Sequence, residues 1–108
     1  MNIIIIEKND KIQIKNDLIT FLVHKHKYSY FLSEIDKATL LLNDVKNEGD
    51  DISLLLRIGD NTFIVPSTHK DFEDFLLNNL CIYLQIDMSK VTEAFSCTDK
   101  AEFVIYER

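Results

Sequence analysis

Two histidines alternate with two lysines in the run His24-Lys25-His26-Lys27, so two possible metal ligands and two cations lie close together in the sequence. Alternate residues of a strand point to one face, so His24 and His26 could share a metal ion while Lys25 and Lys27 approach a phosphate. A zinc site needs at least a third protein ligand, and two lysines hold a phosphoinositide poorly in a chain of net charge −6. The pattern favours a solvated hairpin tip, and whether the two histidines bind metal stays open.

Candidate nucleophiles lack the neighbours that would activate them. Ser67 and His69 lie two residues apart at a predicted helix start, where capping and exposure explain both, and no G-x-S-x-G motif surrounds a serine. Cys81 and Cys97 have no zinc-site spacing, and neither has a neighbouring cation that would favour a thiolate. We predict two unpaired structural thiols and no catalytic residue, and we assign no metal ligand and no cofactor.

Acidic residues outnumber basic ones by 18 to 12 and gather in two groups, one in a polar segment and one at a predicted helix start. The first group lacks the spacing of a calcium loop, and the dipole of a helix would favour the second group in any case. They are either a solvated surface or a patch that speeds and orients association with a basic protein. The candidate partner-binding residues are Asp44, Glu48, Asp50, Asp51, Asp71, Glu73 and Asp74.

Short strands must position these residues over the first two-thirds of the chain. Apolar and β-branched runs separated by turn clusters predict strands at residues 2–7, 11–15, 18–24, 28–32, 37–42, 52–58 and 62–65. We expect the first two strands to pair as a hairpin, and the next two to form a second hairpin. The most polar segment, residues 43–51, is expected to be an exposed loop.

The pattern changes to helical spacing after Ser67. Thr68 and Asp71 have the spacing of a capping box, which predicts a helix from about His69 to Leu84. The side chains expected in the core from this helix are Phe72, Phe75, Leu76, Leu80 and Tyr83. Asp87 is expected to cap a second, short helix, followed by a last strand at residues 102–106. The side chains expected on one face of the second helix are Val91, Ala94 and Phe95.

This succession of elements predicts the α+β class: a strongly bent antiparallel sheet or partly open barrel of about seven strands, capped by an amphipathic helix, with a short second helix and a final strand. Residues 30–37, 51–66 and 71–76 resemble small bacterial pleckstrin-homology-like domains, in which a hydrophobic strand leads through a Ser-x-Ile step into paired strands and a capping helix. The resemblance covers about half of the chain. It implies one such domain over residues 1–108, with a helix–strand extension at about residues 85–108, and a binding scaffold without catalytic residues.

Composition limits the partners. A chain of 108 residues with 46% hydrophobic and 28% charged residues can form one globular domain, and its acidity argues against nucleic acid and anionic membranes. The first residues lack the pattern of a secretory signal, which favours a cytoplasmic location. Together these features resemble bacterial immunity proteins, which bind and neutralise toxin domains, and the expected partner is a basic protein, such as a toxin domain. The alternatives are a general adaptor or a small-ligand or lipid-binding domain; a monomer and a homodimer both stay open.

Overall fold

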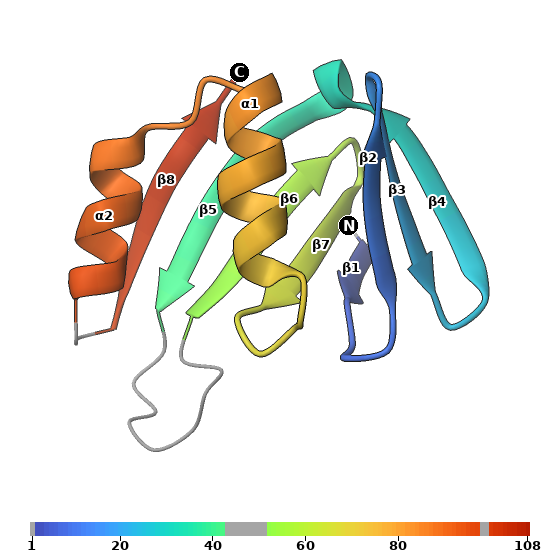
Figure 1. Cartoon of the computed structure of the whole chain (residues 1–108), viewed down its shortest axis with the longest axis horizontal. Helices are drawn as coiled ribbons and strands as arrows, with labels where there is room; N and C mark the ends of the chain where they lie inside the picture. The colour runs from blue at the N-terminus through green and yellow to red at the C-terminus, as the bar shows by residue number, and fades with distance from the viewer. Residues whose placement is uncertain (1, 43–51, 98–99) are drawn as a thin grey trace.

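A computed structural model of the chain describes residues 2–42, 52–97 and 100–108. Within them, eight strands form two sheets, and helices lie on one side of the larger sheet (Figure 1). The strands are β1 (Asn2–Ile5), β2 (Lys11–Lys15), β3 (Leu18–Val23), β4 (His26–Phe31), β5 (Ile35–Leu42), β6 (Ile52–Ile58), β7 (Asn61–Pro66) and β8 (Ala101–Glu107). The helical elements are η1 (Leu32–Glu34), η2 (Asp74–Leu80), α1 (Cys81–Tyr83) and α2 (Met88–Ser96).

The smaller sheet is an antiparallel meander of β2, β3 and β4, which confirms the predicted second hairpin. The larger sheet has the order β1-β7-β6-β5-β8, in which β1 runs parallel to β7 and the other pairs are antiparallel. The predicted α+β class is therefore confirmed. The strands form two sheets and not a closed barrel.

The predicted hairpin between residues 2–7 and 11–15 is wrong. Lys15 pairs with Leu18, so Asn16 and Asp17 form a two-residue turn that joins β2 to β3, and Asn16 adopts the positive φ of 57° that such turns require. Because this connection is so short, β2 pairs with β3 and not with β1. β1 instead pairs with β7, where Ile3 lies beside Thr62.

The core lies between the larger sheet on one side and the helices and smaller sheet on the other. The ring of Phe63 on β7 stacks on Phe21 of β3 with 4.1 Å between centroids, and Tyr28 and Tyr30 of β4 meet Phe63 edge-on. These aromatic contacts attach the smaller sheet to the larger one. The helices complete this layer through the buried side chains of Phe72, Phe75, Leu76, Leu80, Val91 and Ala94.

The first helix starts later than predicted. The backbone is helical from Phe72 to Tyr83, with π-type hydrogen bonding in η2, so Thr68 lies too far before the first helical residue to cap it and the predicted capping box is wrong. Residues 67–71 form turns instead, because the His69 amide donates to the Pro66 carbonyl and the His69 side chain turns inward. Tyr83, predicted to be in the core, is 45% exposed at the end of α1.

The second helix and the last strand are confirmed. Asp87 caps α2 by accepting a hydrogen bond from the Lys90 amide, and α2 packs against β8. Val91 and Ala94 are buried on one face of α2, and Phe95, four residues after Val91, belongs to the same face but is 42% exposed. Phe95 lies about 40° from Val91 and about 100° from Ala94 round the helix, which places it at the edge of this face.

Candidate functional site

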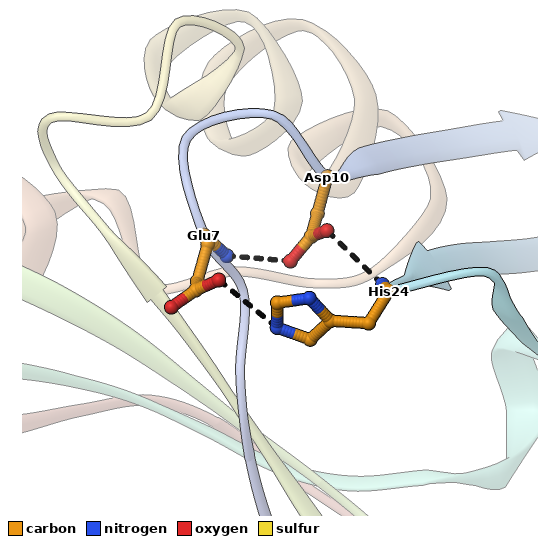
Figure 2. A group of neighbouring side chains, drawn as sticks. All are labelled: Glu7, Asp10 and His24. Carbon is orange, nitrogen blue, oxygen red and sulfur yellow. Dashed lines mark hydrogen bonds and ion pairs between the residues drawn. The ribbon is translucent and has the colours of Figure 1, made fainter.

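Three side chains that can bind a metal ion converge where the β1–β2 loop meets the β3–β4 turn (Figure 2). Glu7 and Asp10 come from the loop, and His24 comes from the turn. Nε2 of His24 lies 2.9 Å from a carboxylate oxygen of Glu7, and one donor atom from each of the three residues lies within 4.8 Å of the others. We name Glu7, Asp10 and His24 the loop–turn cluster.

Asp10 is the fixed member of the loop–turn cluster. Its side chain accepts hydrogen bonds from the amides of Glu7 at 2.7 Å and His24 at 3.3 Å, and the residue is only 7% exposed. The Asp10 carbonyl accepts a further hydrogen bond, 2.8 Å long, from Nε2 of buried His69. Asp10 thus joins the β1–β2 loop, the β3–β4 turn and the segment that leads into η2.

The turn places His24 differently from the predicted strand. Val23 pairs with His26, so His24 and Lys25 are the two central residues of a tight turn, with φ values of 49° and 73°. The expectation that His24 and His26 alternate along one strand and share a face is therefore wrong. His24 instead faces the carboxylate of Glu7.

Sequence reasoning missed Glu7 and Asp10, although the turn cluster Lys8-Asn9-Asp10 was an available signal, since an aspartate in a turn often caps nearby amides. An open pocket of about 540 Å³ adjoins the loop–turn cluster. Its lining consists of residues 5–10, His24 and Pro66. Lys25, His26 and Lys27 are not among these residues, so of the run His24-Lys25-His26-Lys27 only His24 lines this pocket.

The predicted partner-binding acids fall into two groups. Asp44, Glu48, Asp50 and Asp51 lie outside the described residues.

Asp71, Glu73 and Asp74 lie just before and at the start of η2, on the helix-covered side of the larger sheet. Glu73 and Asp74 are exposed, and Asp71 is half-buried. The Asp74 carboxylate accepts hydrogen bonds from the side-chain amides of Asn78 at 2.9 Å and Asn79 at 3.3 Å, so it also stabilises its own helix.

The candidate nucleophiles occupy structural positions. Nδ1 of His69 accepts a hydrogen bond from the Asp71 amide, and Nε2 donates to the Asp10 carbonyl, so backbone groups engage both ring nitrogens. Cys81 and Cys97 are half-buried thiols that no disulfide joins, as predicted. Burial raises the pKa of the Cys81 thiol, which disfavours the reactive thiolate, and Sγ of Cys81 contacts Sδ of Met88 at 3.4 Å.

A second candidate surface lies on the face of the larger sheet that points away from the helices. Cross-strand pairing places five side chains in one continuous row on this face, each beside the next. From β1 to β8 this sheet-face row consists of Ile5, Ile64, Leu55, Thr39 and Val104. Ile5 is 57% exposed, Ile64, Leu55 and Val104 are half-buried, and Thr39 is only 7% exposed. None of the helices and strands that the structure describes lies over the row.

No protein-family model, curated protein or solved structure matches this chain. Within residues 2–42, 52–97 and 100–108, no helix combines the length and the apolar character needed to span a bilayer. Functional inference therefore depends on the loop–turn cluster, the sheet-face row and the charge of the chain.

Proposed function

We propose that this protein is a non-catalytic module that binds a basic protein partner through the sheet-face row. The observation that carries the proposal is the continuity of that row across all five strands of the larger sheet. Single exposed apolar side chains are common on proteins, but contiguous apolar surface typically marks an interaction site. Covering an exposed Ile side chain contributes about 1.5–3 kcal/mol, so Ile5 would contribute most and the half-buried Ile64 and Leu55 less.

Charge selects the class of partner. Positive and negative side chains beside the sheet-face row are nearly balanced in number. Arg57, Lys37 and Glu107 lie next to one another on one side of the row, and Glu102 lies on the other side. The net charge of −6 on the whole chain therefore decides the long-range field, which favours encounter with a cationic protein. In this proposal Asp71, Glu73 and Asp74 contribute to that field from the covered side and do not touch the partner.

We further propose a biological setting, a bacterial immunity protein built on a pleckstrin-homology-like scaffold. Two sheets covered by a helix are compatible with such a scaffold. An acidic antidote with an apolar contact face could occlude the working surface of a basic toxin domain. The engagement of both His69 ring nitrogens by backbone groups supports a non-catalytic role for the Ser67–His69 pair.

Site-specific photo-crosslinking in the source cells tests the proposal. A photoreactive residue at position 64 should give one adduct with a protein of net positive charge, because Ile64 lies in the sheet-face row between Ile5 and Leu55. The matched control is position 82, since Ile82 is 73% exposed but lies on α1, on the other side of the sheet. The identified protein is then purified and its association rate measured against salt.

Association that slows as salt rises, and that is abolished in a Leu55→Lys variant whose circular dichroism shows that it is folded, would support the proposal. An adduct only between copies of this chain would indicate a homo-oligomer interface instead and would overturn it. The proposal is also overturned if position 82 captures the identical protein equally well, or if the captured partner is acidic.

A further inference from the structure

We propose that the loop–turn cluster is a binding site for a divalent first-row transition metal ion, with Zn²⁺ as the reference ion. This inference is independent of the proposed protein-binding function, because the sheet-face row and the loop–turn cluster share no residue. It depends on donor geometry, on the way the structure holds Asp10, and on the chemical types of the three ligands.

The donor geometry is close to that of a metal site. Zinc bonds of about 2.0–2.1 Å in a tetrahedral arrangement put neighbouring ligand atoms roughly 3.3 Å apart. In the structure, Nε2 of His24 and the Glu7 oxygen are 2.9 Å apart, and the full set of donors lies within 4.8 Å. Binding an ion between them would need shifts of less than about 1 Å in each donor, within the reach of rotations of the exposed Glu7 and His24 side chains.

The structure holds Asp10 in place without an ion. Each carboxylate oxygen accepts one backbone amide hydrogen and retains a further lone pair for a ligand bond. The hydrogen bond from His69 to the Asp10 carbonyl fixes the backbone of the same residue. The backbone of His24 is also held in place, because Val23 and His26 pair on either side of the two-residue turn. Little ordering therefore has to accompany binding, which favours affinity.

The ligand types select the class of ion. A neutral imidazole and two carboxylates carry a charge of about −2, which balances a divalent cation. Imidazole nitrogen suits Zn²⁺, Ni²⁺ or Cu²⁺, whereas Mg²⁺ and Ca²⁺ prefer sites made only of oxygen ligands. Three protein ligands leave at least one coordination position, and the adjoining open pocket of about 540 Å³ gives water access to it.

The competing explanation is purely structural, with Asp10 as a clamp for two turns and Glu7–His24 as a surface ion pair. The two explanations predict different results for matched histidine variants. His24 and His26 are both exposed and only two residues apart, but only His24 belongs to the loop–turn cluster. His26→Gln is therefore the control for His24→Gln, and Glu7→Gln removes a second ligand from an exposed position without disturbing the Asp10 clamp.

The experiment is calorimetric titration of the full chain with Zn²⁺ and, separately, with Mg²⁺, accompanied by NMR of the histidine rings. We expect one Zn²⁺ per chain, an affinity for Mg²⁺ at least ~10-fold lower, and losses of at least ~10-fold in Zn²⁺ affinity for His24→Gln and Glu7→Gln. His26→Gln should bind as the unchanged protein does, and the Nε2 resonance of His24 should shift on Zn²⁺ addition. Circular dichroism and melting temperature establish that each variant is folded.

Three results would overturn the proposal. One is a folded His24→Gln variant whose Zn²⁺ affinity stays within twofold of the unchanged protein. Another is an equal ring shift for His26. The last is thiolate-to-metal charge-transfer absorption when Co²⁺ replaces Zn²⁺, because that signal would assign the ion to a cysteine.

Discussion

Leu54 and Leu55 are neighbours in β6, but they lie on opposite faces of the larger sheet and in different environments. Leu54 is fully buried against the layer of helices and the smaller sheet, whereas Leu55 is only half-buried in the sheet-face row. The same contrast separates Phe63 from Ile64 in β7. Consecutive apolar residues in a strand, such as Leu54 to Leu56 in β6, are typical of a strand that is buried on both faces. Here the helices and the smaller sheet cover one face, and no described helix or strand lies over the second, which is the face that we propose binds a partner.

The largest expected effect tests the covered face. Phe63→Ala should lower the free energy of unfolding by about 3–5 kcal/mol, because Phe63 is fully buried and joins the two sheets through its contacts with Phe21, Tyr28 and Tyr30. Urea unfolding followed by circular dichroism measures the change. A loss below about 1 kcal/mol would show that the smaller sheet does not depend on this aromatic contact.

A matched pair of leucines tests the contrast between the faces directly. Leu54→Ala should cost about 2–5 kcal/mol, and Leu55→Ala about 1 kcal/mol, since Leu55 already contacts water in the folded chain. Both variants remove the same atoms from the same strand, so strand propensity cancels in the comparison. Equal losses in urea unfolding would mean that both faces are covered in solution, and the experiment should be repeated across protein concentrations to detect self-association.

The smallest expected effect concerns α2, one of the helices on the covered face. Hydrogen bonds from the Ser89 hydroxyl and then the Lys90 amide lower the pKa of Asp87 below its ordinary value of 3.8. A carboxyl group with a lowered pKa in the folded state contributes stability above its ordinary value, and that contribution disappears as the pH falls through the folded value.

The melting temperature should therefore fall more steeply between about pH 5 and pH 2 in the unchanged protein than in Asp87→Asn, which keeps a good capping side chain but does not ionise. Parallel melting curves for the two proteins would mean that the Asp87 cap is not formed in solution. The comparison should be made at low salt, because exposed charges are screened.

Local pattern predicted most of the elements. Alternation in β2, the turn residues around Gly59 and the Asp87 cap were all visible in the sequence, and each is confirmed by the structure. Those signals depend on residues close together along the chain, where geometry follows directly from side-chain type.

Contacts between segments that are far apart in the sequence could not be predicted from local pattern. The pairing of β1 with β7 joins residues 59 positions apart, and nothing in the apolar run Ile3-Ile4-Ile5-Ile6 specifies a parallel partner. The loop–turn cluster was hidden for a related reason, because His24 occupies a two-residue turn without the Asn-Gly signature that marks such turns. Burial of the His69 side chain likewise depends on a carbonyl from the other half of the chain.

The parallel β1–β7 pair also has a consequence for the order of events at the ribosome. At about 5–20 residues per second, the segment that pairs with Asn2 is synthesised roughly 3–12 s after it, since the partner is Asn61. During that interval the apolar residues of β1 have no strand to join, whereas the β2–β3–β4 meander can already close on itself. β1 is thus translated well before β7, and it can join the larger sheet only after that partner strand has been made.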